Sequence, residues 1–336
     1  MNRNAGISLL RVCSMLMIVL CHYCNYIGIS WLAQFLNVGV YNFLLMSGWL
    51  YSKKRIDQPK RWILLRWKKL CVPVLVWMVL VIIYAVVVEH ELPPLSDVFL
   101  FLTNMQGLSW VFLKFTQIHS EGVLGGLGNL WFVTVIMLCY LILVLAKKLE
   151  ERKIIQNKFL TAVISIVCFI CLAFCGIQLM YFICFLIGYA LGREKENIAL
   201  RKYVYVTAGM IAAVAIRLAA KHFIDGTTVY DIIVVGSSHT TIAVWIFYTV
   251  RFLDEKINWF HLLAASKATQ KCDELSFFIY ITHYYFLAKR FNLKTRVPGL
   301  FFQTALFCTL SLITALLVKW ISKQINSHIL MKTEGK

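Results

Sequence analysis

Two ionisable side chains share one face of the first apolar segment, residues 7–27. Arg11 and His22 are eleven residues apart, which on an α-helix is about 20° more than three full turns and about 16 Å of rise. Ionisable groups inside an apolar span cost about 2.5 to 3.5 kcal/mol, so they usually mark function. The spacing favours a site in which Arg11 meets an anion and His22 moves a proton. The alternative is structural: Arg11 extends to the lipid head groups and His22 packs.

A second group of basic side chains precedes the third apolar segment. Arg66 and Lys69 are three residues apart and therefore share a helix face. A guanidinium group is well suited to bind phosphate or pyrophosphate. With Arg11 the two residues are expected to form a basic pocket that opens to the cytoplasm, although the charge bias of membrane proteins accounts for part of the cluster.

A third group lies near the end of the chain. Ser276, Tyr280 and His283 follow one another at i, i+4 and i+7, which again places them on one helix face. A histidine in a membrane cavity suggests proton transfer or general base catalysis. Each histidine taken alone is more often a packing residue.

No metal site or disulfide framework is expected from the eleven cysteines, which lie almost all in apolar runs. Cys21 and Cys24 flank His22 with the spacing of a metal or redox motif, but no second pair accompanies them. We therefore expect no metal and no permanently bound cofactor.

The composition places these residues in a membrane. Hydrophobic residues make up 60% of the 336-residue chain and charged residues 15%, against about 25% charged in soluble domains. The mean hydropathy is +0.74. A soluble globule is excluded, and the net charge of +18 is explained by basic loops at a membrane, so no nucleic-acid partner is expected.

The apolar runs predict an all-α polytopic integral membrane protein with about ten transmembrane helices, each of which needs about 20 residues to cross the bilayer. The ninth run is short, and the break between the fifth and the sixth is weakly marked. The ten runs are 7–27, 33–52, 71–89, 130–147, 159–175, 177–192, 203–220, 231–250, 275–289 and 299–321.

The distribution of Lys and Arg predicts the orientation. With the N-terminus in the cytoplasm, 26 of these residues fall on the cytoplasmic side and six outside, while Arg11 and Arg217 lie within spans. Such a bias favours two cytoplasmic termini in the cell (inner or plasma) membrane. We expect one transmembrane domain over residues 1–325 and a short cytoplasmic tail over 326–336.

Five motifs in this order resemble the acyltransferase family 3 membrane proteins, the O-acetyltransferases of bacterial surface glycans. The resemblance covers nearly the whole chain. The motifs are Arg11-x10-His22, Gly39-Val40-x-x-Phe43-x-x-x-Ser47-Gly48-Trp49-Leu50, Arg66-x-x-Lys69-x-x-x-Pro73, Leu130-Trp131-Phe132 and Ser276-x-x-x-Tyr280-x-x-His283.

The resemblance implies an enzyme that takes an acetyl group from cytoplasmic acetyl-CoA and delivers it to a hydroxyl of a polysaccharide or oligosaccharide. Arg11 and His22 match the functional arginine and histidine of the family, and Arg66 and Lys69 match its basic pair. Two residues depart from the pattern. Lys69 stands where a second arginine is commoner, and Asn129 stands where many relatives have a histidine.

The resemblance and the chemistry together suggest a mechanism. Arg11, Arg66 and Lys69 would hold the phosphates of coenzyme A. His22 would act as the general base on the acceptor hydroxyl or carry the acetyl group as a nucleophile.

Ser47 and Gly48 would allow a close approach of the thioester, and His283 and Tyr280 would orient the acceptor or donate to the oxyanion. Trp131 is assigned to the substrate site. The long connection 90–129 would shape the acceptor site, with Glu121 as a candidate partner of a histidine. Besides acetyl-CoA and a glycan acceptor, which is possibly lipid-linked, the expected partners are membrane lipids and polysaccharide assembly proteins.

Two other classes stay open. In a secondary transporter or a lipid-linked sugar flippase, Arg11, His22 and His283 would line the path of a proton or substrate. An inactive scaffold in a polysaccharide assembly complex is the third possibility. Consumption of acetyl-CoA by the purified protein distinguishes the enzyme from both.

Overall fold

The computed structural model describes residues 5–108, 122–151, 179–193, 200–227, 229–288 and 291–334. Within these ranges every regular element is an α-, 3-10 or π-helix, and no strand occurs. The predicted all-α fold is therefore confirmed for the described residues. The chain divides into two compact units, which we call unit 1 (Met1–Arg55 and Gln178–Ser276) and unit 2 (Ile56–Ile177 and Phe277–Lys336). Whether they form the single expected domain stays a prediction.

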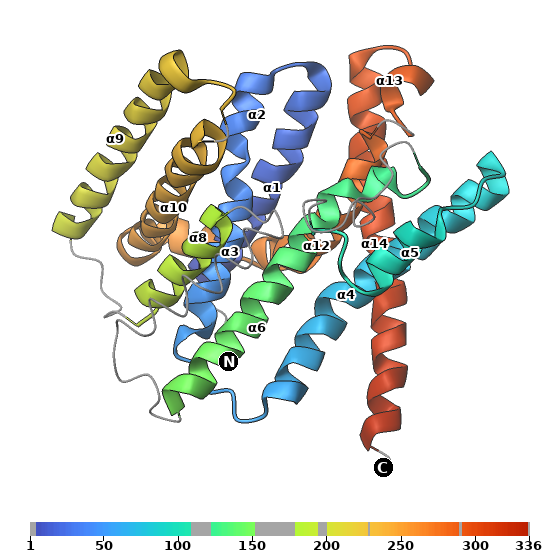
Figure 1. Cartoon of the computed structure of the whole chain (residues 1–336), viewed down its shortest axis with the longest axis horizontal. Helices are drawn as coiled ribbons and strands as arrows, with labels where there is room; N and C mark the ends of the chain where they lie inside the picture. Colours follow the sequence, from blue (N-terminus) through green and yellow to red (C-terminus); the bar gives the residue numbers. More distant parts are fainter. Residues whose placement is uncertain are drawn as a thin grey trace. The chain divides into compact units, whose positions relative to one another are not determined.

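Unit 1 packs around α3, which contacts α1, α8 and α10, while α9 packs against α10 (Figure 1). Glycine makes the contact of α3 with α8 close: a side chain on Gly48 would overlap the carbonyl of Phe185, and one on Gly188 would overlap that of Leu45. The helices of unit 1 are α1 (Ala5–Ile27), α2 (Ser30–Leu36), α3 (Val38–Ser52), α8 (Leu179–Leu191), α9 (Leu200–Ile224), η4 (Tyr230–Val235), α10 (Gly236–Lys256), α11 (Asn258–Ala265) and the first part of α12 (Lys267–Thr282).

Unit 2 is organised by α4, which packs against α5, α6 and α14. Its core is aromatic. The ring of Trp77 stands edge-on to Tyr285 at 5.6 Å between centroids, and Trp62 stands edge-on to Tyr140 at 5.4 Å. The elements of unit 2 are α4 (Pro59–Tyr84), η1 (Ala85–Glu89), α5 (Leu95–Leu102), η3 (Gly125–Leu130), α6 (Trp131–Glu151), the end of α12, η5 (His283–Phe286), α13 (Leu293–Arg296) and α14 (Leu300–Glu334).

Six helical segments of the described chain are long and apolar enough to cross a membrane. Five of them contain one of the ten predicted runs in full, and Leu300–Ser327 contains all but the first residue of the run 299–321. Only 6% of the apolar window of α9 is buried inside the structure, against 61% for the window in α6, as expected if lipid covers α9. The six are Ala5–Ile27, Pro59–Glu89, Gly125–Lys148, Leu200–Ile224, Tyr230–Lys256 and Leu300–Ser327.

The other predicted runs differ from single spanning helices. The run 33–52 is divided at Asn37, because α2 folds back and its Ala33 packs against Cys21 and Cys24 of α1. The run 177–192 contains the shorter α8, and the run 275–289 ends as an α-helix at Thr282. The run 159–175 lies outside the described residues, so the count of ten stays a prediction, as does the orientation of the termini.

Candidate active site

Arg11 forms an ion pair with Asp273, which is 262 residues away in the sequence. Its Nη1 donates to both carboxylate oxygens of Asp273 at 3.0 Å. The carboxylate is 2% exposed and the arginine side chain 32%. A charge-assisted pair of this kind compensates the cost of burying the acid. Arg11 is therefore an anchored, partly exposed side chain and not an isolated cation.

Asp273 is a site residue that the sequence motifs did not include. It lies three residues before Ser276 and therefore extends the predicted face of Ser276, Tyr280 and His283 toward the start of α12. The Ser276 hydroxyl donates to the backbone carbonyl of Asp273 at 2.8 Å. The sequence did contain a signal for this residue: it is an acid at the edge of an apolar run, and it lies on the same helix face as Ser276 and Tyr280.

His22 lies on α1, half-buried, in the same turns that α2 covers. Its neighbours Cys21 and Cys24 are buried against Ala33 of α2, with Ile29 and Leu32 beside them. Because α1 is one uninterrupted helix from Ala5 to Ile27, Arg11 and His22 share the face that their spacing predicts. His22 therefore lies about three helical turns from Arg11, toward the bend between α1 and α2.

Tyr280 is held in unit 2 by a reciprocal pair of hydrogen bonds with Asn129 of η3. The Asn129 Nδ2 donates to the Tyr280 carbonyl at 2.9 Å, and the Tyr280 hydroxyl donates to the Asn129 carbonyl. The ring of Phe132 stands edge-on to Tyr280 at 5.8 Å. The asparagine that departs from the family pattern therefore fixes the position of the tyrosine.

His283 is fully buried at the junction of α12 and η5. Its Nδ1 lies 3.0 Å from the carbonyl of Ile279 and 2.9 Å from that of Tyr280. Carbonyl oxygens only accept hydrogen bonds, so Nδ1 carries the proton in the neutral ring and Nε2 carries the lone pair. This is the tautomer in which Nε2 can accept a proton.

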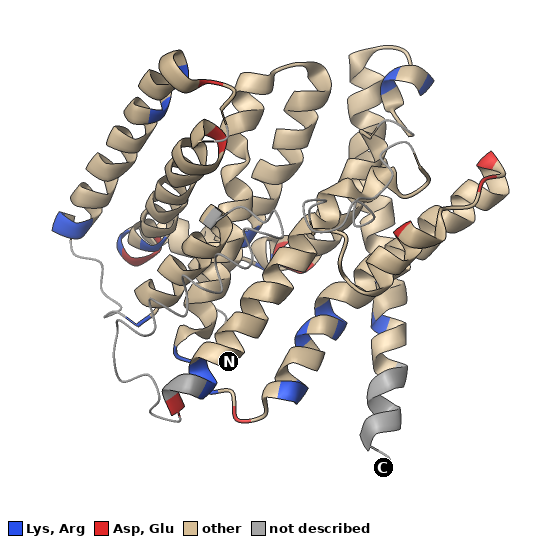
Figure 2. Ribbon diagram, viewed as in Figure 1, with Lys and Arg blue, Asp and Glu red and all other residues tan. Residues whose placement is uncertain are grey.

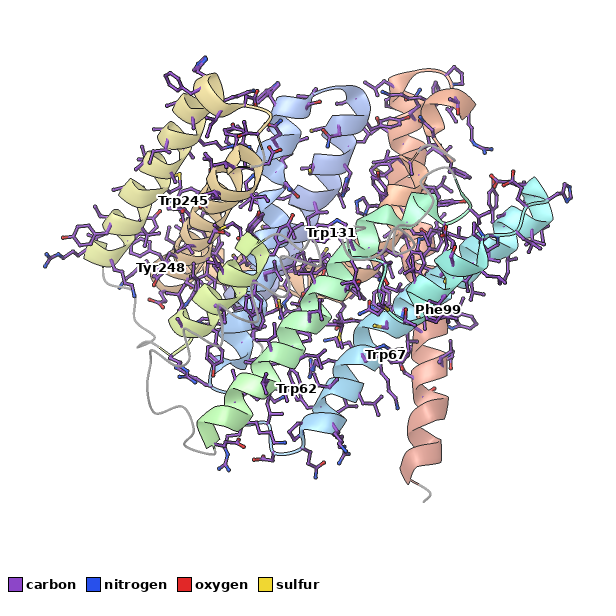
Figure 3. All side chains as sticks on the ribbon, viewed as in Figure 1. Trp62, Trp67, Phe99, Trp131, Trp245 and Tyr248 are labelled. Atoms are coloured by element: carbon purple, nitrogen blue, oxygen red, sulfur yellow. The ribbon has the colours of Figure 1, made fainter. Side chains whose placement is uncertain are left out.

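Arg66 and Lys69 turn to different surroundings on α4. The guanidinium of Arg66 lies 5.4 Å above the ring of Trp62, whose position at the lower end of α4 is labelled in Figure 3. Lys69 lines a pocket of about 480 Å³ together with Lys68, and Arg66 is not among the residues that line it. The two predicted donor-binding residues are neighbours in unit 2, but only the lysine faces that pocket.

The comparison with known families decides the identity of the chain. A family model of acyltransferase family 3, described as an acyltransferase domain, matches residues 4–322. The chain belongs to acyltransferase family 3. The range covers all the candidate residues of both units, and with the six spanning helices it makes the protein a multi-pass membrane acyltransferase. No curated protein and no solved structure gives a significant match to the chain.

Three candidate residues of this acyltransferase have simple packing surroundings. Gly48 is buried and faces the backbone of α8 at Phe185, while Ser47 is half-buried. Trp131 begins α6, edge-on to Phe132 at 6.3 Å, as the label in Figure 3 locates it. Glu121 lies outside the described residues. In the described part of the acyltransferase no three His, Cys, Asp or Glu side chains gather as a metal site would require.

Unit 1 of the acyltransferase contains a second arginine within an apolar helix. No partner was predicted for this residue from the sequence. Arg217 of α9 is 3% exposed, lies 4.6 Å above the ring of Phe35, and has its Nη1 3.1 Å from Nε2 of His239. The same Nε2 lies 2.7 Å from the carbonyl oxygen of Gln34. This cation is held by aromatic and neutral groups, in contrast to Arg11 with its carboxylate.

Proposed function

We propose that this acyltransferase moves an acetyl group from cytoplasmic acetyl-CoA to a hydroxyl of a cell-surface or exported polysaccharide or oligosaccharide. The observation that carries the proposal is the family match over residues 4–322, which includes Arg11 and His22 on one uninterrupted helix. The proposed location is the cell (inner or plasma) membrane with both termini in the cytoplasm, supported by the bias of 26 basic residues to six.

In the proposed reaction His22 acts on the acceptor. The ring nitrogen that carries the lone pair takes the hydroxyl proton while the acceptor oxygen attacks the thioester carbonyl, the C–S bond breaks, and the proton passes to the departing coenzyme A sulfur. In the covalent variant the nitrogen itself attacks, the thiol leaves, and the acceptor oxygen then takes the acetyl group from the imidazole. Both routes need a neutral His22 before the first step.

Donor binding is assigned to Arg66, Lys69 and Arg11. A guanidinium fork or a lysine ammonium is attracted to the phosphates of coenzyme A. Because Nη1 of Arg11 is bound by Asp273, Arg11 would meet a phosphate only through the rest of its guanidinium. The ion pair thus orients the arginine before the donor arrives.

His283 and Tyr280 are proposed to act on the acceptor side. Nε2 of His283 carries the lone pair, since Nδ1 is directed at two carbonyl oxygens, so it can accept a hydrogen bond from a sugar hydroxyl. Tyr280 positions that ring through the carbonyl that both Asn129 and His283 contact. Trp131 and Ser47 complete the proposed substrate site.

The decisive experiment measures acetyl-CoA turnover by the purified protein in detergent, with a total glycan extract of the native host as acceptor. We expect transfer by the wild type and a loss of about 10³-fold in His22→Ala, the range that a general acid–base residue contributes. His222→Ala, an exposed histidine at the end of α9, is the matched control and should retain full activity. Full activity of His22→Ala would remove His22 from the chemistry.

If folded wild-type protein neither consumes nor binds acetyl-CoA, the transporter or flippase assignment replaces the enzyme. In that case Arg11, His22 and His283 would be tested by substrate uptake into vesicles. Binding without turnover would instead call for fractionated acceptors, including lipid-linked glycans.

The donor assignment is tested with Arg66→Ala. We expect the KM for acetyl-CoA to rise about tenfold with little change for the acceptor, because the variant loses one charge-assisted contact. Lys69→Arg should remain active, since it restores the commoner family residue. An unchanged donor KM in Arg66→Ala would reassign that residue to topology and to its stacking on Trp62.

A further inference from the structure

A pocket of about 480 Å³ lies between α4 and α14 in unit 2, where α12 adds a single residue to its wall. Figure 2 shows Lys and Arg on the lower turns of α4 and below the midpoint of α14. The lining comes from one face of each helix, with spacings of three and four residues. The residues are Leu65, Lys68, Lys69, Pro73, Phe278, Lys319, Ser322, Lys323, Asn326 and Ser327.

The side chains that line this pocket give it a positive charge. Two lysines come from each helix, Lys68 and Lys69 from α4 and Lys319 and Lys323 from α14, while no Asp or Glu is among the described residues that line it. Four ammonium groups around one cavity repel one another and attract a multivalent anion. A phosphate group carries negative charge and acceptor oxygens that complement these ammonium groups.

A buried hydroxyl points to a ligand at the same place. Ser322 lines the pocket, is 2% exposed, and its Oγ has no hydrogen-bond partner among the described residues. A buried polar atom without a partner is uncommon and costs free energy. A ligand oxygen in the pocket would satisfy it, with Asn326 on the next turn as a further donor.

Part of the wall is apolar. Leu65, Pro73 and Phe278 line the same cavity as the lysines. Trp320, next to Lys319, is 61% exposed, as is common for tryptophan at the level of lipid head groups. The ligand is therefore amphipathic.

The pocket is distinct from the candidate catalytic face. Phe278 and Tyr280 are two residues apart on α12 and therefore point in directions about 200° apart. Tyr280 faces Asn129 and Phe132, whereas Phe278 faces the lysines. A ligand in the pocket would not occupy the surroundings of His283.

We propose that this pocket binds an anionic phospholipid. Its phosphate would lie among Lys68, Lys319 and Lys323, its glycerol oxygens beside Ser322, and its acyl chains along Leu65, Pro73 and Phe278. Basic pockets between transmembrane helices on the cytoplasmic side are a recurrent site of this type. The inference goes beyond acetyl transfer and holds whether or not the acyl donor is acetyl-CoA.

The test uses the full-length protein in phosphatidylcholine vesicles that contain a photoactivatable phosphatidylglycerol as the probe. After illumination, mass spectrometry locates the labelled peptides. We expect label on residues 65–73 and 319–327, at about a tenth of that level with a photoactivatable phosphatidylcholine. Lys68→Gln/Lys319→Gln/Lys323→Gln should reduce the phosphatidylglycerol label at least about tenfold, since each lysine near an anionic lipid contributes about a fivefold gain in affinity.

Two variants control for charge and folding. Lys256→Gln/Lys267→Gln/Lys271→Gln removes the same charge from lysines of unit 1 that do not line the pocket and should keep the label. Lys68→Arg/Lys319→Arg/Lys323→Arg keeps the pocket charge and should also keep it.

Three results would overturn the proposal: equal labelling by both lipids, equal loss in the pocket and control triple variants, or displacement of the label by soluble coenzyme A. The last result would assign the pocket to the acyl donor. Acetyl transfer, measured separately on each variant, distinguishes a failure of this inference from a failure of the proposed function.

Discussion

The basic residues of unit 1 and unit 2 are accommodated in different ways. In unit 1, Arg11 is bound by the buried carboxylate of Asp273, and Arg217 is buried against Phe35 and His239. In unit 2, four lysines of α4 and α14 converge on one pocket whose described lining contains no acid. Arg11 and Arg217 are thus held by groups of unit 1, whereas the four lysines of unit 2 line one cavity.

The difference teaches that the number of basic residues does not identify a phosphate site. Arg11 was expected to bind phosphate because it is a cation inside a span. The structure gives it a partner, which turns it into an oriented side chain. The lysines near residue 320 were expected only to mark the cytoplasmic side, and the structure makes them walls of a cavity.

The comparison predicts its largest stability effect at Asp273. Asp273→Ala removes the carboxylate from Arg11, and we expect it to destabilise the protein by about 2 kcal/mol. This is less than the 3 to 5 kcal/mol of a fully buried pair, because Arg11 is 32% exposed. Denaturant titration in a fixed detergent measures it.

A double-mutant cycle separates the interaction energy of the ion pair from the effects of the two single substitutions. Arg11→Ala/Asp273→Ala should be less destabilised than the sum of the two single variants, because the double variant leaves neither charge unpaired. Strict additivity would show that the two side chains do not interact, and the contrast between the units would then disappear.

The next largest loss of stability is expected at the hydrogen bonds between Tyr280 and Asn129 in unit 2. Tyr280→Phe removes the hydroxyl that donates to the Asn129 carbonyl, and we expect a loss of about 1 kcal/mol, the usual contribution of one hydrogen bond. Acetyl transfer should fall as well, since Tyr280 also positions His283. Tyr205→Phe, which removes a hydroxyl from an exposed tyrosine of α9, serves as the control. Unchanged stability and activity in Tyr280→Phe would remove Tyr280 from the site.

The sequence predicted which residues share a helix face. It missed the pairings that depend on tertiary structure. Arg11 and His22 lie on one continuous α-helix, and Ser276 and Tyr280 lie on another, as about 3.6 residues per turn predicts. The pairing of Arg11 with Asp273 joins residues 262 positions apart, which no local pattern contains.

The sequence pattern also failed to predict where the chain reverses direction or leaves the α-helical conformation. Hydropathy predicted one span over 33–52, because α2 is as apolar as a spanning helix, yet it folds back onto α1 after Gly28, whose φ is +90°. The helix expected over 275–289 changes to a 3-10 turn at His283. Apolar composition specifies burial in lipid or protein but not which of the two.

The smallest change in stability is expected in the lysine pocket. Its size tests the contrast between these lysines and Arg11. Lys323 is exposed and lines the pocket with no acid beside it in the lining, so Lys323→Gln should change the stability in neutral detergent by less than about 0.5 kcal/mol. Relief of repulsion from Lys319, one turn away, makes a slight gain the expected sign. Anionic lipid should stabilise the wild type more than the variant, because only a ligand that binds the folded state adds stability. A loss of 1 kcal/mol or more in neutral detergent would mean that Lys323, like Arg11, is held by the protein itself, and the distinction between the two units would fail at that residue.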